Sequence, residues 1–499
     1  MKDRNLKSLL VPWHSTESCE FGDICLDSRL LNETDVFVAI KGSEGHGADY
    51  IPTVDSLKLT AVLIDESDLY ACQCAEQSGQ IFYEIPSLTL QLGVLAQNCY
   101  GQPGKEIEIT AVTGTNGKSS IVYLLAQAFS KLGFVAKMMG TIGNGSWDSS
   151  TESQRTTADV FSVYRQLRKW ADMGVTHVAM EVSSHALVQG RIAGLQIKHA
   201  VFTNLSRDHL DYHADMHEYG DAKAQLLKQP GVEFVHLNRD DAWVAQLGAT
   251  NNRQELVSLS SQHDCHITDA ECIRAKSVVT RISGCEFDLY VQSSGKLIPA
   301  LHISNDLVGR FQVDNLLAVI SVLFKSGVSY QKLEALCSQM VTVPGRMQTL
   351  HSNCCDVIVD YAHTPDGLAA ALGSLRAIHN GSISCVFGCG GDRDRGKRPL
   401  MAKVVEKFSD QIVVTSDNPR CESQEQIKAD IKQGFEQLHN VVFIDDRREA
   451  IKWSLKTASK NSVIMLAGKG HESGQYIKGQ VLPFDDVSVA REELEAMSC

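Results

Sequence analysis

The sequence predicts an α/β protein with mostly parallel sheets, divided into several domains. Short apolar segments with the character of buried strands alternate with longer segments of helical periodicity. This alternation is typical of parallel sheets with right-handed crossovers. The chain has 499 residues, which is too long for a single hydrophobic core, so roughly two to four domains are expected.

Three regions of the chain differ in texture. Residues 1–105 mix short apolar runs with turn-rich stretches such as KGSEGHG and end at the turn-forming segment GQPGK. Residues 106–342 contain the predicted strands EITAV, THVAMEV, HAVFTNL and EFVHLN. Residues 343–499 repeat the alternation with CDVIVDY, SCVFGCG, QIVVTSD, VVFID and SVIMLAG. We predict a domain boundary at each of the two transitions.

Net charge and the N-terminal sequence limit the class of protein. The formal net charge is −13, which argues against broad binding to nucleic acid or to anionic membranes. The N-terminal segment lacks the apolar run and cleavage site of a signal peptide. No segment approaches the roughly 20 apolar residues of a membrane helix. We therefore expect a cytoplasmic protein without membrane insertion.

A candidate phosphate loop follows the first strand of the middle region. The segment TGTNGKS, residues 113–119, lies between EITAV and the apolar-periodic helix SSIVYLLAQAF. A strand, a glycine-rich turn and a helix N-terminus together present N–H groups to phosphate oxygens. Lys118 is suited to the terminal phosphates and Ser119 to Mg²⁺. The generic pattern is met only in part, because Val112 occupies the place of its first glycine; the alternative is an ordinary glycine-rich turn.

Two further strands of the middle region are followed by groups that suit a metal. Glu181 ends THVAMEV, and His209 follows HAVFTNL. Carboxylate and imidazole at neighbouring strand ends could complete a magnesium site facing the phosphate loop. Each signal is weak alone, and zinc is disfavoured by the absence of HExxH and of cysteine ligands. Lys223 lies in a predicted helix, where a lysine is ordinarily solvated.

Charged residues of the last region also concentrate after strands. They lie in GCGGDRDRGKRP, SDNPR and AGKGHE. Because ligands bind at the carboxyl ends of parallel strands, these loops suit a substrate with both amine and carboxylate groups. The alternative is an ordinary charged surface.

The chain resembles the Mur ligase family from near residue 26 to the C-terminus. Nine motifs occur in the order of the family, namely TGTNGKS, MEVSSHALVQGR, FTNLSRDHLDYH, YxxAK, PGRM, DYAHTPD, GCGGDRDRGKRP, TSDNPR and AGKGHE. The resemblance implies three domains: a UDP-sugar-binding domain at residues 1–105, a P-loop ATPase domain at 106–342, and a Rossmann-like amino-acid-binding domain at 343–499. It also implies that the shortened phosphate loop is the family's own form.

The resemblance implies roles for individual residues. The expected ATP contacts are Gly114, Thr115, Asn116, Gly117, Lys118, Ser119 and Ser120, with Asn315, Arg346 and Asp360 at the base and ribose. The expected UDP-MurNAc-dipeptide contacts are Leu26, Ser28, Ser43, Glu44 and Gly45 at the uridine end, and Thr156, Thr157, Ser183, Gln189 and Arg191 at the dipeptide. The expected diaminopimelate contacts are Arg393, Asp417, Asn418, Pro419, Arg420, Gly468 and Glu472. Arg155 stands where a relative often has asparagine and receives no role.

The implied catalytic and metal-site residues overlap. Lys118, Lys223, Glu181 and His209 are expected to be catalytic. Lys223 is expected to be carboxylated and to form the Mg²⁺ site with Ser119, Glu181 and His209. The resemblance thus gives Lys223, which the helical pattern alone leaves as a solvated lysine, a second reading as a metal-site group.

The implied reaction is ATP-dependent formation of an amide in peptidoglycan precursor synthesis. The D-glutamate side-chain carboxylate of UDP-MurNAc-L-Ala-D-Glu would become an acyl phosphate, and an amine of meso-2,6-diaminopimelate would displace the phosphate. We expect a monomer. The alternatives are a lysine-adding relative, a folate polyglutamylating enzyme, against which SDNPR and LDSR argue, and a non-catalytic scaffold, against which the five residues Lys118, Ser119, Glu181, His209 and Lys223 argue together.

Overall fold

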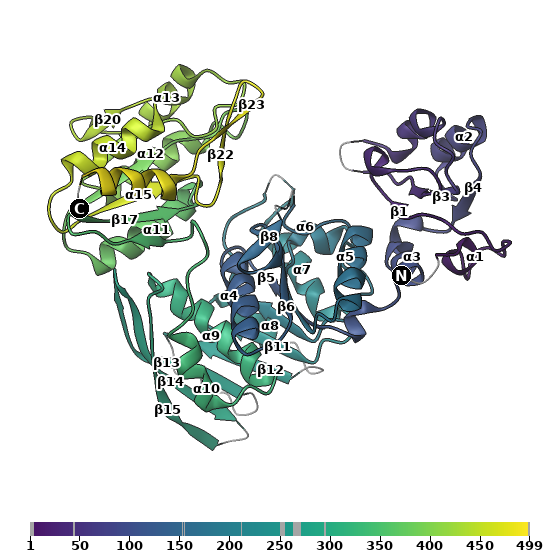
Figure 1. The fold of residues 1–499 in the computed structure, drawn as a ribbon, viewed down its shortest axis with the longest axis horizontal. Helices are drawn as coiled ribbons and strands as arrows, with labels where there is room; N and C mark the ends of the chain where they lie inside the picture. Colours follow the sequence, from purple (N-terminus) through teal and green to yellow (C-terminus); the bar gives the residue numbers. More distant parts are fainter. Residues whose placement is uncertain are drawn as a thin grey trace. The chain divides into compact units, whose positions relative to one another are not determined.

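The computed structural model of the protein describes residues 4–42, 45–151, 153, 155–210, 212–249, 255–262, 271–293 and 296–497 (Figure 1). The chain forms two units. The first comprises Met1–Leu259, Cys265–Glu271 and Ala318–Gly327, and the second comprises Ser260–Asp264, Cys272–Leu317 and Val328–Cys499.

The N-terminal part of the first unit is built on a small parallel sheet in the order β1-β2-β3-β4. Its strands are β1 (Ile24–Cys25), β2 (Val36–Val38), β3 (Ala61–Asp65) and β4 (Phe82–Ile85), and its α-helices are α1 (Leu6–Leu9), α2 (Leu69–Gln77) and α3 (Leu88–Tyr100). Successive strand residues face opposite sides of a sheet. Phe37 and Val62 accordingly pack in the cluster that contains Ala71 of α2, whereas Val38 packs in the cluster that contains Leu92 of α3.

The second sheet of the first unit carries the phosphate loop. Its strands run in the order β12-β11-β10-β5-β9-β6-β7-β8, and all pairs from β12 to β6 are parallel. The strands are β5 (Glu108–Thr113), β6 (Ala136–Gly140), β7 (Gly143–Ser146), β8 (Ser149–Thr151), β9 (His177–Glu181), β10 (His199–Phe202), β11 (Phe234–Asn238) and β12 (Glu255–Ser260). The helices are α4 (Lys118–Lys131), α5 (Val160–Asp172), α6 (Ser184–Val188), α7 (Met216–Ala224) and α8 (Ala242–Ala249). β7 and β8 pair antiparallel, a departure from the predicted alternation.

A three-stranded antiparallel meander follows in the chain. It consists of β13 (Glu271–Arg281), β14 (Gly284–Ser293) and β15 (Lys296–Asn305). These antiparallel strands are the exception within the middle region, for which a mostly parallel sheet was predicted. β14 follows β13 after only Ile282 and Ser283, as antiparallel pairing permits. α9 (Arg310–Lys325) and α10 (Tyr330–Cys337) come next.

The C-terminal sheet of the second unit has the order β16-β17-β21-β18-β19-β20. It is parallel except for β16. The strands are β16 (Gln348–Leu350), β17 (Cys355–Asp360), β18 (Ile383–Phe387), β19 (Gln411–Val414), β20 (Val441–Phe443) and β21 (Ser462–Ala467), with a separate hairpin of β22 (Gly474–Ile477) and β23 (Gln480–Pro483). One face packs against α11 (Pro365–Ile378), α12 (Lys397–Phe408) and α13 (Gln424–Lys432), and the other against α14 (Arg447–Thr457) and α15 (Asp486–Ala496).

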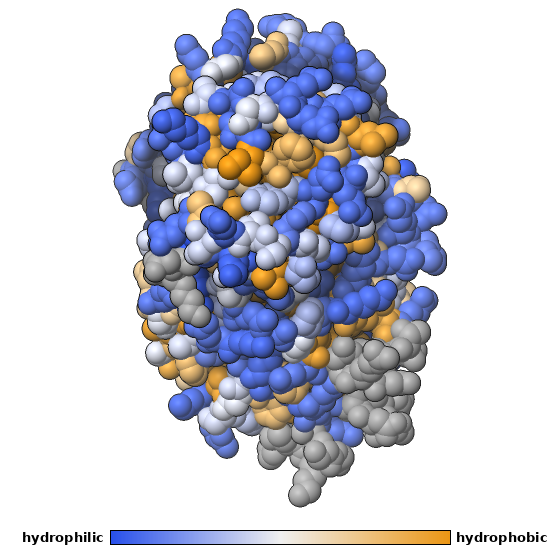
Figure 2. All heavy atoms as spheres, turned by 90° about the vertical axis from the view of Figure 1, so that its right-hand side faces the viewer, coloured by the Kyte–Doolittle hydropathy of each residue, from blue (hydrophilic) through white to orange (hydrophobic). Residues whose placement is uncertain are grey.

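The structure confirms the predicted α/β class with mostly parallel sheets, and every strand that the sequence analysis quoted forms. The exact domain bounds at residues 105 and 342 stay predictions. No α-helix within the described ranges combines the length and apolar character of a membrane span. Figure 2 shows one face of the molecule, on which polar side chains predominate and apolar ones are scattered among them.

Candidate functional site

The phosphate loop lies between β5 and α4, as predicted, and its shape requires glycine. Gly114 has φ +147°, and a Cβ there would lie 1.8 Å from Oγ1 of Thr203. Gly117 caps α4 with φ 89°. An L-residue at Gly114 would be strained by both its backbone conformation and this close approach. The missing first glycine of the generic pattern is therefore compatible with a formed loop.

The residues after β10 hold the loop in place. The backbone N–H groups of Thr115 and Asn116 donate to O and Oδ1 of Asn204, each at 2.9 Å. Thr203 Oγ1 donates to the Asn116 carbonyl at 2.6 Å. Because β10 and β5 are neighbouring strands, these bonds fix the loop to the same edge of the sheet that carries the other candidate residues.

Two lysines converge on one carbonyl of this loop. Lys118 Nζ donates to the Gly114 and Thr115 carbonyls at 2.9 and 2.8 Å. Lys223 Nζ, from α7, donates to the same Gly114 carbonyl at 2.9 Å and lies 4.3 Å from the ring centroid of Tyr219. Burial, and then the charge of Lys118, lower the pKa of Lys223 to about 6. The helical pattern alone suggested a solvated lysine; that reading is wrong, because the Lys223 side chain is only 1% exposed.

Glu181 lies beside the start of the phosphate loop. It ends β9 and is the register partner of Val112 in β5. Its side chain is buried, and Oε1 accepts the backbone N–H of Thr141 at 2.8 Å. Gly140 leaves room for this carboxylate, since a Cβ there would lie 2.3 Å from Oε1. The predicted strand-end carboxylate is thus held at the edge of the sheet that carries the loop.

His209 belongs to an aromatic cluster next to Lys223. Its ring lies 4.9 Å from that of His185 and 6.0 Å from that of Tyr219, and its backbone is left-handed with φ 54°. His213, four residues later, is buried with Nε2 2.9 Å from Ser184 Oγ, so the two histidines do not form a helical metal pair. Within the described ranges, no three His, Cys, Asp or Glu side chains are grouped as a metal site.

The residues expected to bind the dipeptide are brought together around the loop that precedes α5. Thr157 Oγ1 donates to the Glu181 carbonyl and accepts the backbone N–H of Ser183 at 3.2 Å. Arg191 donates to the Thr157 carbonyl at 2.7 Å and, through Nε and one terminal nitrogen, to Gln189 Oε1. Burial, and then the charge of Arg155, lower the pKa of Arg191. Thr156 Oγ1 accepts from the Thr141 hydroxyl at 3.2 Å, which joins this group to Glu181.

The uridine-end prediction falls on the N-terminal sheet. Leu26 packs on its core, and Ser28 opens a short 3₁₀ turn. The Gly45 carbonyl accepts from Gly42 N at 2.8 Å; Ser43 and Glu44 lie outside the described residues. A hollow of about 610 Å³ opens nearby, lined by Ala39, Ile40, Lys41, His46, Asp65, Ser67, Asp68, Leu69, Tyr70 and Thr89. Sequence reasoning did not identify this hollow, because its lining comes from four separate segments.

The three residues expected at the base and ribose lie in the second unit. Asp360 is buried at the end of β17 and accepts backbone N–H groups of Met347 and Ala362 at 2.8 and 2.9 Å. Burial raises its pKa, and Arg346 opposes that rise. The Arg346 guanidinium lies 4.5 Å from the ring centroid of Tyr361. Asn315 is buried on α9.

The loops after β19 and β21 form a connected polar site. Asn418 Nδ2 donates to Glu472 Oε2 at 2.8 Å. Lys469, which was not among the predicted site residues, is fully buried and donates to Glu472 Oε2 at 3.1 Å and to Asn418 Oδ1 at 3.3 Å. Asp417 is buried, which raises the pKa of its carboxyl. Lys469 stands in the quoted motif AGKGHE, so the motif held a signal for it.

Arg420 is held at both backbone and side chain. Its backbone is left-handed with φ 53°, and its N–H donates to the Tyr476 carbonyl in β22 at 2.9 Å. Its guanidinium donates to the Gly391 carbonyl at 2.8 Å. The preceding Pro419 is buried, and Arg393, in the facing loop, is exposed. Gly468 has φ +111°, and a Cβ there would lie 3.3 Å from Asp417 Oδ2.

Comparison with known proteins agrees with this geometry. The Mur ligase middle domain matches residues 112–323, and the Mur ligase, glutamate ligase domain matches residues 345–470. A Chromobacterium violaceum protein named UDP-N-acetylmuramoyl-L-alanyl-D-glutamate–2,6-diaminopimelate ligase is 38% identical, over 94% of this chain and 93% of its own. A Coxiella burnetii protein of the same name is 40% identical, over 94% of both. A solved structure of a ligase with that name is 32% identical, covers 100% of both chains and superposes with a TM-score of 0.70. The chain therefore belongs to the Mur ligase family.

Proposed function

We propose that this protein is an ATP-dependent ligase of peptidoglycan precursor synthesis. It adds meso-2,6-diaminopimelate to the D-glutamate side-chain carboxylate of UDP-MurNAc-L-Ala-D-Glu. The relatives of that name, 38–40% identical over nearly the whole chain, support the choice of substrates. The observation that carries the chemistry is the pair of lysines, Lys118 and the buried Lys223, on the Gly114 carbonyl of a phosphate loop.

The first step activates the carboxylate. A carboxylate is a poor acylating agent because oxide leaves badly. Its oxygen attacks the γ-phosphorus of ATP, the bond to ADP breaks, and an acyl phosphate forms. The backbone N–H groups at the start of α4 and the Lys118 ammonium neutralise charge on the transferring phosphoryl group. Arg191 and Gln189, which are joined to Thr157 and Ser183, orient the dipeptide.

Lys223 has the properties needed for carboxylation. With its pKa lowered to about 6, the amine is mostly neutral at pH 7 and its lone pair can attack CO₂. A carbamate forms and one proton is released. The reaction replaces a mostly neutral amine with an anion next to the phosphate loop. In this proposal Lys223 contributes a negatively charged carbamate to the site rather than an amine.

Mg²⁺ fits the donors present. It takes oxygen ligands, usually one or two protein carboxylates, with water and phosphate completing its shell. In the proposed site Glu181 would supply a buried carboxylate, Ser119 a hydroxyl at the start of α4, and Lys223, once carboxylated, a carbamate; His209 is assigned to the same site. When bound, Mg²⁺ neutralises phosphate charge and holds the phosphates in position.

The second step forms the amide. An amine of diaminopimelate attacks the acyl carbon, a tetrahedral intermediate forms, and phosphate leaves while the nitrogen loses a proton to solvent. Arg420 suits the distal carboxylate of diaminopimelate, because guanidinium binds carboxylates in a bidentate manner. Glu472, Asp417 and the Gly468 backbone suit the ammonium. We place the enzyme in the cytoplasm, as a monomer.

Mass analysis of the products tests the proposal. The protein is incubated with UDP-MurNAc-L-Ala-D-Glu, ATP, Mg²⁺ and either meso-diaminopimelate or L-lysine. We expect the diaminopimelate adduct with one ADP released per amide. An adduct with lysine as well would contradict the amino-acid assignment, and no adduct together with no ADP would favour a non-catalytic scaffold.

A further inference from the structure

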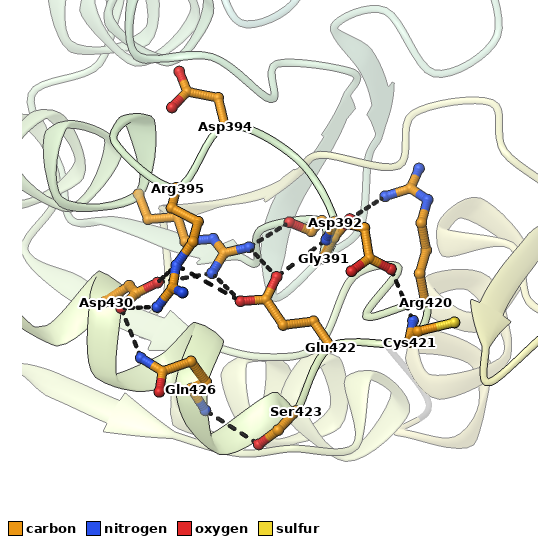
Figure 3. A network of polar contacts seen from close by, with 12 residues as sticks. Gly391, Asp392, Asp394, Arg395, Arg420, Cys421, Glu422, Ser423, Gln426 and Asp430 are labelled. Atoms are coloured by element: carbon orange, nitrogen blue, oxygen red, sulfur yellow. Dashed lines mark hydrogen bonds and ion pairs between the residues drawn. The ribbon is translucent and has the colours of Figure 1, made fainter.

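Arg398 is a fully buried arginine close to the proposed amino-acid site, and its terminal nitrogens bind protein groups. Two of its partners, Glu422 and Asp430, are labelled in Figure 3. It lies in the first turn of α12. Its guanidinium donates to both carboxylate oxygens of Glu422 at 2.8 and 2.6 Å, to Asp430 Oδ2 at 2.8 Å, and to the Gly390 carbonyl at 3.1 Å. A charge without solvent is costly unless it is paired and hydrogen-bonded, and here carboxylates supply that pairing.

These bonds join two loops. The first, residues 390–395, follows β18, and the second, residues 417–423, follows β19. Glu422 Oε2 also accepts the backbone N–H of Asp392 at 3.0 Å, and Asp392 Oδ2 accepts that of Cys421 at 3.0 Å. The loops touch closely, since a Cβ on Gly391 would lie 2.0 Å from the Pro419 carbonyl oxygen. Arg398 and Glu422 therefore set how the first loop lies on the second.

The position of Gly391 matters because of Arg420. The Gly391 carbonyl accepts a hydrogen bond from the Arg420 guanidinium at 2.8 Å, while the Arg420 backbone is held separately by the Tyr476 carbonyl. A shift of the first loop would thus turn the guanidinium without moving its backbone. The hydrogen bonds of Arg398 lower the pKa of Glu422 to about 2, so this link stays ionised at every working pH.

We propose that Arg398 and Glu422 are positioning residues for the distal carboxylate of the amino acid, acting through the Gly391 carbonyl on Arg420. This inference rests on the proposed function, because it assigns Arg420 to that carboxylate. The competing account is that Arg398 only joins α12 to α13 through Asp430. The two accounts differ in whether loss of Arg398 changes the KM for diaminopimelate specifically.

The test compares Arg398→Lys with Arg395→Ala. Arg395 lies in the same segment, binds the same Asp430 at 3.0 Å and approaches Glu422 only to 3.9 Å, but its side chain is 56% exposed and it has no bond to Gly390. Lysine at 398 keeps the charge and cannot bind Glu422 and Gly390 together. We expect Arg398→Lys to raise the KM for diaminopimelate about tenfold or more, as small misplacements do, with the KM values for ATP and UDP-dipeptide unchanged. Arg395→Ala should leave all three KM values unchanged.

Glu422→Gln provides a second variant that keeps the shape of the side chain. It should raise the same KM, and the double variant Arg398→Lys/Glu422→Gln should add little to either single change. A lower melting temperature and kcat with an unchanged diaminopimelate KM, in Arg398→Lys or Glu422→Gln, would overturn the inference in favour of a purely structural role. A wild-type enzyme that does not use diaminopimelate would instead overturn the proposed function.

Discussion

The Lys118 ammonium is held over the phosphate loop by two carbonyls of that loop. Alanine at this position removes the cation while leaving the anchoring bonds from Thr203 and Asn204 intact. We expect Lys118→Ala to stay folded and to lower ADP formation by about 10²–10³-fold, the usual loss for a group that stabilises transition-state charge. Lys131→Ala, at the far end of the same helix, is the control. Near-normal ADP release by Lys118→Ala would remove the assignment of the phosphate loop.

Burial of Lys223 keeps its amine neutral and lowers the free energy of unfolding at neutral pH. Its pKa is about 6 in the folded protein against 10.5 unperturbed, so the unfolded chain binds one more proton between these values. Stability of the wild type therefore rises with pH across this window. We expect Lys223→Met, which has no such charge to bury, to melt at a higher temperature than the wild type at pH 7 without CO₂, and to be inactive. The difference in melting temperature should shrink as the pH approaches 10.

Two observations would contradict this account of Lys223. One is a difference in melting temperature that does not depend on pH. Burial of Lys223 as a neutral amine requires that folding releases a proton, so the difference must depend on pH. The other is an active Lys223→Ala enzyme. Millimolar short carboxylates are expected to restore part of the activity of Lys223→Ala by filling the anionic position.

For single residues, the sequence indicated a chemical role more readily than it indicated burial or contacts within the fold. Lys118 follows from local pattern, because strand, glycine turn and helix are consecutive. The environment of Lys223 does not follow from local pattern, because its side chain is buried against the Gly114 carbonyl, which is 109 positions away in the chain. Arg398 is similar, since its charged motif suggests a ligand contact, whereas the fold turns its side chain toward Glu422 and Asp430.

The loop after β19 carries the residues proposed to select the amino acid. Arg420 donates to the Tyr476 carbonyl from its backbone and to the Gly391 carbonyl from its guanidinium, so the guanidinium is oriented by the protein itself. We expect Arg420→Lys to raise the KM for diaminopimelate by about tenfold or more, because an ammonium cannot form the bidentate pair. KM values for ATP and UDP-dipeptide should not change. Arg448→Ala, an exposed residue of α14, is the control, and equal changes in all three KM values would contradict the assignment.

Helices and strands with their own apolar periodicity could be predicted from the sequence. Strands that form only because a neighbouring strand offers hydrogen-bond partners could not. β5 and α4 follow from apolar periodicity and the glycines between them. β7 and β8 include GNGS and SST, which carry no apolar pattern and become strands only because β6 offers an edge. β14 has alternating residues, but nothing local states that its partners run antiparallel.

The residues proposed for phosphoryl transfer and those proposed to bind the amino acid lie in different units. Lys118, Glu181 and Lys223 lie in the first unit, and Asp417, Asn418 and Arg420 lie in the second. We expect Arg420→Ala to release about one ADP per enzyme with UDP-dipeptide and ATP in a single turnover, yet to form little amide when diaminopimelate is added. Lys118→Ala should release neither product. Loss of the ADP burst in a folded Arg420→Ala enzyme would mean that the amino-acid site also controls activation.

The Gly114 carbonyl accepts from both Lys118 and Lys223, so nucleotide binding and the proposed carboxylation of Lys223 are thermodynamically reciprocal. Each lysine disfavours positive charge on the other, and a carbamate on Lys223 turns that repulsion into attraction. If the carbamate strengthens nucleotide binding by a given free energy, then nucleotide binding stabilises the carbamate by the same free energy. If Lys223 is carboxylated as proposed, the dissolved CO₂ concentration becomes an effector of ATP affinity.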